Sequence, residues 1–154
     1  MTPDDGVDPD SPDGRPGRRP LHLRPGACAL VVAGGVAGTA ARYGLARAFP
    51  TRSGHWPTGT FVANLVGAFV LGVLLEALLR SGPDTGVRRR LRLLLGTGFC
   101  GGFTTYSTFA VEADLLVRDH HTGLAVGYVA ATLVAGAVLS VAGIALAARY
   151  RRIA

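Results

Sequence analysis

The chain has 154 residues, 49% of which are hydrophobic, and its net charge of +6 comes from arginine alone because the sequence contains no lysine. Four apolar stretches fill most of the sequence after residue 25, and they lack the polar faces that helices of a soluble domain need. The arginines flank these stretches, so we interpret them as membrane-topology signals and expect no nucleic-acid partner. The composition therefore predicts an all-α membrane protein surrounded by lipid.

The N-terminal part of the chain divides into a polar tail and two apolar spans. Residues 1–24 are rich in Asp and Pro and contain no apolar core of a signal peptide, so we expect a disordered tail. The first predicted span, residues 26–48, carries small residues suited to close helix contact. A short loop, residues 49–57, leads to the second span, residues 59–79, which has the polar Asn64 inside it.

A loop rich in Gly, Pro and Arg, residues 80–92, precedes the third predicted span, residues 91–117. Within this span, Gly101 and Gly102 each disfavour a helix by about 1 kcal/mol relative to Ala, and the threonines at 104–105 can bond the backbone. We therefore expect the third helix to be broken at mid-membrane. Because lipid offers no hydrogen-bond partner, broken backbone persists there only if it is buried in protein, lines a watery cavity or binds an ion. We interpret the segment as an ion site.

The fourth predicted span, residues 123–148, has a small residue at every fourth position and so presents a smooth face to another helix. These small residues are Gly123, Gly127, Ala131 and Ala135. Residues 25–150 then form one domain of four transmembrane helices. An even number of spans places both termini on the same side of the membrane.

The arginine distribution predicts which side that is. We set Arg42 aside as a candidate functional residue. One side has three arginines, Arg47, Arg52 and Arg118. The side with the termini and the 80–92 loop has twelve, namely Arg15, Arg18, Arg19, Arg24, Arg80, Arg88, Arg89, Arg90, Arg92, Arg149, Arg151 and Arg152. The positive-inside rule therefore predicts that both termini, including the tail, lie in the cytoplasm. We expect a multi-pass protein of the cell inner (plasma) membrane.

Three motifs follow one another along the chain: residues 34–43 (GGVAGTAARY), residues 59–67 (GTFVANLVG) and residues 101–109 (GGFTTYSTF), the last followed by Glu112. With these motifs in four spans, the sequence resembles the bacterial fluoride channels of the CrcB/Fluc type over residues 30–148. The resemblance implies a passive channel through which cytoplasmic fluoride escapes, which reduces fluoride toxicity. It also implies an antiparallel dimer of dual topology, with two pores and a structural sodium ion (Na⁺) at its centre.

The resemblance assigns roles to residues in the second and third spans. It implies that the backbone carbonyls of Gly101 and Thr104 bind the sodium ion, together with the same pair from a second subunit, and hard oxygen ligands suit such a cation. A glycine kink that serves helix packing is the alternative. It also implies that Asn64 lines the fluoride pathway and donates its NH₂ group to the anion. The alternative is a hydrogen bond that only joins two helices.

Aromatic and cationic residues complete the implied pathway. Tyr106 and Phe109 are three residues apart and share a helix face. The family usually has Phe at both positions, where positive ring edges face the anion, so Tyr106 keeps the ring edge and adds a hydroxyl. The alternative is an aromatic packing stripe. By the resemblance, Arg42 belongs to a vestibule in which its charge concentrates anions, and the alternative is an Arg that snorkels to the membrane interface.

Hydroxyl groups are weaker candidates for the pathway. Thr132 and Tyr128 in the fourth span, and Ser107 and Thr108 beside the aromatic pair, could offer donors to the pore. Ser and Thr in membranes more often bond their own helix. Glu112 matches the family pattern, and we interpret it as a polar contact at the end of a helix.

Two other functions fit four short spans. A small proton-coupled multidrug-type transporter needs a titrating carboxylate at mid-membrane, whereas Glu76 and Glu112 lie near the ends of their predicted spans. A non-conducting membrane assembly protein would use its glycine faces only for packing. We do not expect an enzyme, because no nucleophile, base and orienting group are grouped in the sequence.

The arginine bias also bears on the predicted dimer. A chain that inserts in both orientations should have balanced flanks, and twelve arginines against three are not balanced. The partner is therefore either a second copy, in a homodimer, or an oppositely oriented related chain, in a heterodimer. Our hypothesis is that this subunit inserts one way and pairs with a related chain.

Overall fold

The computed structural model describes residues 24–150, and every regular element in that range is a helix. The elements are α1 (Pro25–Ala48), α2 (Thr58–Arg80), α3 (Gly86–Leu91), η2 (Arg92–Cys100), α4 (Gly101–Phe103), α5 (Tyr106–Arg118) and α6 (Thr122–Tyr150). The predicted disordered tail lies outside the described residues, except for Arg24, which precedes α1.

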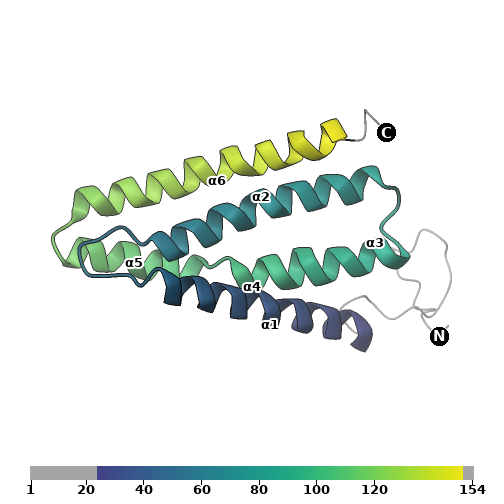
Figure 1. Cartoon of the computed structure of the whole chain (residues 1–154), viewed down its shortest axis with the longest axis horizontal. Helices are drawn as coiled ribbons and strands as arrows, with labels where there is room; N and C mark the ends of the chain where they lie inside the picture. The colour runs from purple at the N-terminus through teal and green to yellow at the C-terminus, as the bar shows by residue number, and fades with distance from the viewer. Residues whose placement is uncertain (1–23, 151–154) are drawn as a thin grey trace, which may run out of the picture.

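The chain runs four times along the long axis of the molecule (Figure 1). α1, α2 and α6 each make one pass, and α3, η2, α4 and α5 together make the third. Within residues 24–150, α1, α2 and α6 are the three helices long and apolar enough to cross a membrane. Each begins and ends within two residues of a predicted span. The start of α1 and the end of α6 lie at the same end of the bundle (Figure 1).

Before the glycine pair, the third pass is not the regular α-helix that an apolar span predicts. Its first long segment, η2, is a π-helix of nine residues. Gly101 and Gly102 then keep a helical backbone, and helical conformation stops after Phe103. Gly102 instead serves helix packing, because a Cβ atom there would overlap the carbonyl oxygen of Gly35 on α1.

Glycines allow the backbones of α1 and the third pass to touch. A Cβ atom on Gly34 would overlap the carbonyl oxygen of Leu94, and one on Gly38 would overlap that of Phe99. From the other side, a Cβ atom on Gly98 would lie 2.7 Å from the carbonyl oxygen of Val31. The small residues of α1 therefore make the close helix contact that their spacing predicts.

Most of the predicted 80–92 loop is helical, so that expectation was wrong. α2 continues to Arg80 and α3 begins at Gly86, which leaves only a short connection. Within it, the carboxylate of Asp84 accepts hydrogen bonds from Arg92, at 3.1 Å from Nε and 2.7 Å from Nη2. These hydrogen bonds from Arg92 lower the pKa of Asp84 below its ordinary value, because they favour the ionised carboxylate.

An aromatic core joins α5 to α6. The rings of Phe109 on α5 and Tyr128 on α6 have centroids 5.2 Å apart, and Trp56 packs edge-on against Tyr128 at 5.5 Å. Tyr128 is completely buried. The two halves of the third pass thus have different main neighbours, since η2 and α4 pack on α1 whereas α5 packs on α6.

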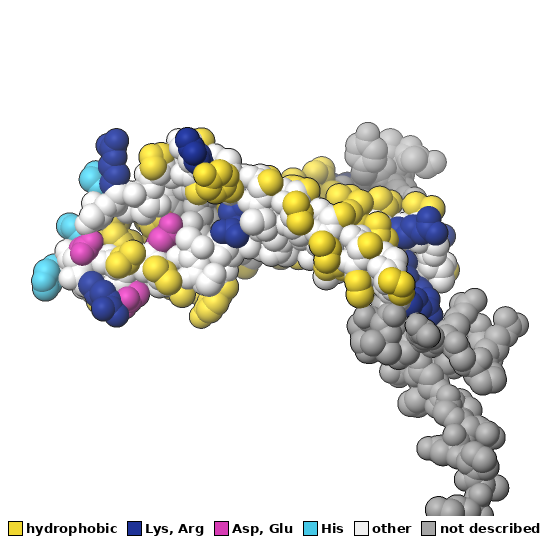
Figure 2. Space-filling model, turned by 90° about the horizontal axis from the view of Figure 1, so that it is seen from below, with side chains coloured by type: hydrophobic (Ala, Val, Ile, Leu, Met, Phe, Trp, Pro, Cys, Tyr) yellow, Lys and Arg dark blue, Asp and Glu magenta, His cyan; other side chains and the backbone are white. Residues whose placement is uncertain are grey.

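The surface of the bundle is largely apolar along its length. Val36 on α1 is 66% exposed and Leu133 on α6 is 63% exposed. Figure 2 shows hydrophobic side chains spread over one face, with charged and histidine side chains mainly toward the ends. This distribution is typical of a chain surrounded by lipid or by other helices.

Candidate ion site at the interrupted third pass

The third pass contains two extended residues between α4 and α5. Thr104 has φ −79° and ψ 157°, and Thr105 has φ −149° and ψ 122°. Both hydroxyls bond nearby backbone, as the sequence predicts. Thr104 Oγ1 donates to the carbonyl of Cys100 at 2.8 Å, and Thr105 Oγ1 accepts from the backbone N–H of Thr108 at 3.2 Å. Thr105 is therefore the N-cap of α5.

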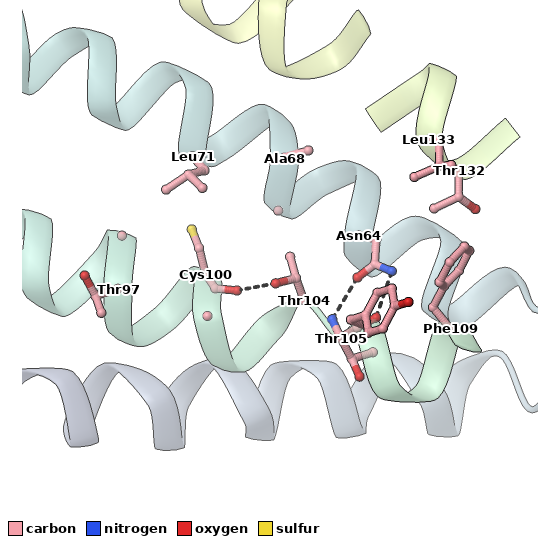
Figure 3. A pocket seen from close by; sticks show the side chains of 14 residues that line it. Asn64, Ala68, Leu71, Thr97, Cys100, Thr104, Thr105, Phe109, Thr132 and Leu133 are labelled. Atoms are coloured by element: carbon pink, nitrogen blue, oxygen red, sulfur yellow. Dashed lines mark hydrogen bonds between the residues drawn. The ribbon is translucent and has the colours of Figure 1, made fainter. Parts of the chain in front are cut away.

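Asn64 on α2 points its carboxamide at this interruption (Figure 3). Its Oδ1 accepts the backbone N–H of Thr105 at 2.8 Å, and its Nδ2 donates to the carbonyl of Thr105 at 3.1 Å. One of the two N–H groups of the carboxamide is thus engaged by the protein backbone. The other is the donor that an anion could use.

Arg42 on α1 reaches the same segment from another side. Its Nε donates to the carbonyl of Gly102 at 3.2 Å, and the residue is half-buried. Gly102 lies in the last turn before the interruption, where helix carbonyls lack their usual donors and carry partial negative charge. The contact places the guanidinium of Arg42 beside the last helical residues before the interruption.

A pocket of about 510 Å³ opens beside the interruption, between α2, the third pass and α6. It is bordered by six predicted site residues, Asn64, Gly101, Thr104, Tyr106, Phe109 and Thr132. Figure 3 shows how α2, η2 and α6 contribute side chains to it. The pocket lining does not include Arg42, Ser107 or Thr108.

The predicted aromatic pair lies together, but its members have different surroundings. The ring centroids of Tyr106 and Phe109 are 6.2 Å apart. Phe109 is 8% exposed in the core with Tyr128, whereas Tyr106 is 82% exposed at the mouth of the pocket. Phe109 therefore has a packing role in this chain whatever else it does, and the ring of Tyr106 is open to a ligand or to a second subunit.

The predicted hydroxyl donors mostly bond the protein. Thr132 Oγ1 donates to the carbonyl of Tyr128 at 2.7 Å, one turn back in its own helix. Thr108 Oγ1 accepts from Thr105 Oγ1 at 3.1 Å, and Ser107 Oγ lies 3.3 Å from that same hydroxyl. Within the described residues, these hydroxyls therefore contact the backbone of their own helix or one another.

Glu112 is a residue that the sequence reasoning undervalued. Instead of making an end-of-helix contact, its carboxylate is buried in the middle of α5. Its Oε1 accepts from the hydroxyls of Thr60 at 2.9 Å and Thr51 at 3.2 Å, and its Oε2 accepts from the Tyr128 hydroxyl at 3.0 Å. The carboxylate so joins α5, α2, α6 and the α1–α2 connection. Only the match of Glu112 to the family motif signalled its importance in the sequence.

Comparison with known proteins decides the family. A family model described as CrcB-like protein, Camphor Resistance (CrcB), matches residues 29–144. The chain belongs to the CrcB-like protein family. This assignment confirms the resemblance inferred from the three sequence motifs, and the match to the CrcB-like model covers most of α1, the interrupted third pass and most of α6.

Curated relatives of this CrcB-like chain are named as channels. Fluoride-specific ion channel FluC 2 of Leifsonia xyli subsp. xyli is 51% identical over 84% of this chain and 88% of its own length. Fluoride-specific ion channel FluC 1 of Cutibacterium acnes is 48% identical over 78% of this chain and 84% of its own length. Fluoride-specific ion channel FluC of Chlorobaculum tepidum is 44% identical, over 77% and 91% respectively.

The oxygen atoms at the interruption limit what this CrcB-like chain could bind. Residues 24–150 contain no group of three or more His, Cys, Asp or Glu side chains that could hold a metal ion. The oxygen atoms at the interruption belong to backbone carbonyls and hydroxyl groups, and such oxygens suit hard ions such as sodium. Gly101 and Thr104 both border the pocket, so the residues fit such an ion.

Proposed function

We propose that this chain is a subunit of a fluoride channel that lets cytoplasmic fluoride leave the cell passively and so reduces fluoride toxicity. The names of the curated relatives support fluoride as the permeant ion. The single structural observation that carries the proposal is the pocket at the helix interruption, where a carboxamide and aromatic rings lie beside the extended residues between α4 and α5.

The chemistry of fluoride explains why such a pocket suits it. Fluoride is small and tightly hydrated, so a low-dielectric passage must replace its lost water with donors. The free N–H of Asn64 and the ring edges of Tyr106 and Phe109 can interact with the ion without a full countercharge. Ser107 and Thr108 would hold the start of α5 in place through their contacts with the Thr105 hydroxyl, and Thr132 would line the same pocket. Binding of this kind is weak enough for the ion to leave, which conduction requires.

The proposed sodium ion would be structural. The carbonyls of Gly101 and Thr104 would hold it, and its charge would offset the partial negative charge of carbonyls at the end of a helix. One chain supplies only this pair, so a second subunit would supply the remainder. The small residues on the outer face of α6 support such an assembly, because a Cβ atom on Gly123 or Gly127 would meet nothing within 4 Å.

The proposed arrangement is an antiparallel dimer in the inner membrane. All four passes of each subunit would cross the bilayer, including the interrupted one, and the interruption would lie at mid-membrane. Both termini of this chain would be cytoplasmic, as the arginine count predicts. The partner would be an oppositely oriented related chain, with a second copy of this chain as the simpler arrangement.

Fluoride release from liposomes tests the proposed function. The purified full-length chain is reconstituted in vesicles loaded with potassium fluoride, valinomycin removes the charge imbalance, and an electrode measures released fluoride. We expect rapid release without a proton gradient and no comparable release of chloride. Release that needs a proton gradient would instead identify a coupled transporter. Absence of release, both alone and with an oppositely oriented relative, would leave a non-conducting assembly protein.

A further inference from the structure

The interruption of the third pass begins at one backbone N–H group. In a continuous α-helix, each N–H donates to the carbonyl four residues earlier. Thr104 keeps this pattern, since its N–H donates to the carbonyl of Cys100 at 3.0 Å. Thr105 does not, because its N–H donates to Oδ1 of Asn64 at 2.8 Å instead of to the carbonyl of Gly101. The helix therefore ends where the Thr105 N–H donates to Asn64 Oδ1 and not to the carbonyl of Gly101.

Asn64 binds both polar backbone groups of Thr105. Besides accepting the N–H, it donates Nδ2 to the carbonyl of Thr105 at 3.1 Å. A carboxamide presents a donor and an acceptor side by side, as a neighbouring β-strand does to an extended residue. Thr105 has that extended conformation, with φ −149° and ψ 122°. The pair of bonds thus selects a backbone conformation as well as joining two helices.

We infer that Asn64 is a positioning residue that holds the third pass open at Thr105 and thereby releases the carbonyl of Gly101 from helical hydrogen bonding. The link from this carbonyl to a sodium ion rests on the function proposed above, whereas the conformational role does not. The role is also compatible with anion binding, because Asn64 keeps a second N–H on Nδ2.

Of the three neighbouring carbonyls of Cys100, Gly101 and Gly102, that of Gly101 is the one that this arrangement leaves for a ligand. The carbonyl of Cys100 accepts both the N–H and the hydroxyl of Thr104. The carbonyl of Gly102 accepts Nε of Arg42 at 3.2 Å. Gly101 lies between them. In a continuous helix its carbonyl would accept the N–H of Thr105, but that N–H donates to Asn64. Gly101 also borders the pocket, and a Cβ atom there would meet nothing within 4 Å.

NMR of the full-length protein in lipid bilayers tests the inference. The ¹³C shift of Thr105 Cα reports an extended or helical backbone, and that of the Gly101 carbonyl reports its hydrogen bonding. Asn64→Leu keeps nearly the same shape without polar atoms, so we expect loss of the extended signal at Thr105 and a shift of the Gly101 carbonyl. Asn64→Asp retains an acceptor but no donor, so we expect a partial loss.

Thr132→Val is the matched control. Thr132 borders the same pocket, but its hydroxyl bonds only its own helix, so both signals should stay at their wild-type values. An extended Thr105 signal that persists in Asn64→Leu would overturn the inference. If that variant does not fold, the wild-type protein decides: a dipolar contact between Asn64 Cγ and Thr105 N supports the role, and its absence overturns it.

Fluoride release measured on the same samples separates this inference from the proposed function. Wild-type protein that shows the dipolar contact but releases no fluoride would refute the channel and leave the role of Asn64 intact. An Asn64→Leu variant that stops fluoride release while Thr105 stays extended would refute the positioning role and support direct contact with the anion.

Discussion

Glu112 connects four parts of the chain through its carboxylate. It accepts hydroxyl hydrogen bonds from Thr51, Thr60 and Tyr128. In Glu112→Gln the NH₂ group cannot accept, so the proton of at least one buried hydroxyl loses its acceptor. We expect this variant to lose about 2 kcal/mol of stability, since hydrogen bonds to a charged group contribute about 1.5–3 kcal/mol. Thermal unfolding in detergent, followed by circular dichroism, measures the loss.

The control for Glu112 lies two residues further along α5. Asp114 is exposed and forms an ion pair with Arg118, at 2.6 Å, one turn away. Exposed pairs of this kind contribute little, so Asp114→Asn should change stability by less than about 0.5 kcal/mol. Equal losses in the two variants would show that the hydroxyl contacts of Glu112 add nothing beyond a surface charge.

Tyr106 offers a second test at the level of single residues. Its ring is 82% exposed, and Phe at this position would keep the ring edge that the anion is proposed to meet. We therefore expect Tyr106→Phe to release fluoride at nearly the wild-type rate. Tyr106→Ala should release it about tenfold more slowly, because a lost aromatic contact of about 1.4 kcal/mol has that effect on a rate. Equal rates for Tyr106→Ala and wild type would remove this ring from the pathway.

Among the elements, the contact between α1 and the third pass depends most on the absence of side chains. A Cβ atom on Gly38 would overlap the carbonyl oxygen of Phe99 and lie 2.8 Å from the backbone nitrogen of Phe103. Neither backbone atom can move without shifting a helix, so Gly38→Val should cost at least about 3 kcal/mol or prevent folding. Folded yield and the unfolding midpoint measure this cost.

Gly44 on the same helix provides the comparison. A Cβ atom there would meet nothing within 4 Å, and Ala favours a helix over Gly by about 1 kcal/mol. Gly44→Ala should therefore fold normally and be slightly more stable than the wild type. A loss of stability in Gly44→Ala would mean that this part of α1 contacts a further surface.

The three long helices and the α1 contact could be predicted from local sequence because apolar length and glycine spacing are local properties. The exact site of interruption could not. Helix propensity marks both the glycines and the threonines as weak helix formers. The residue at which the helix ends depends on the contact with Asn64, which lies 41 positions from Thr105. The contacts of Glu112 likewise join residues up to 61 positions apart. Such pairings require the relative register of helices, which a single sequence does not provide. We could identify no feature of the sequence that predicts the π-helix of η2.

At the scale of the whole molecule, the arginine bias predicts one orientation. The start of α1, the α2–α3 connection and the end of α6 lie at the same end of the bundle (Figure 1). Most arginines of residues 24–150 belong to these segments or flank them. Fusions of green fluorescent protein and alkaline phosphatase to the C-terminus measure its location. We expect fluorescence without phosphatase activity, because the positive-inside rule predicts a cytoplasmic C-terminus.

A variant with fewer positive charges is the control for orientation. Changing Arg88, Arg89 and Arg90 together to Gln reduces the bias, so the phosphatase fusion should gain activity. Strong signals from both fusions in the wild-type chain would show insertion in two orientations. A homodimer would then need no related partner.

The different neighbours of the two halves of the third pass have a consequence for how mutational effects combine. A rotation at one end of a continuous helix would reach the other end, whereas two extended residues separate α4 from α5. Gly34→Ala, against η2, and Leu116→Ala, against α6, should therefore have energies that add within about 0.5 kcal/mol in the double variant. Chemical unfolding of the three variants measures the sum. Additive energies would mean that substitutions in one half of the third pass need no compensating change in the other.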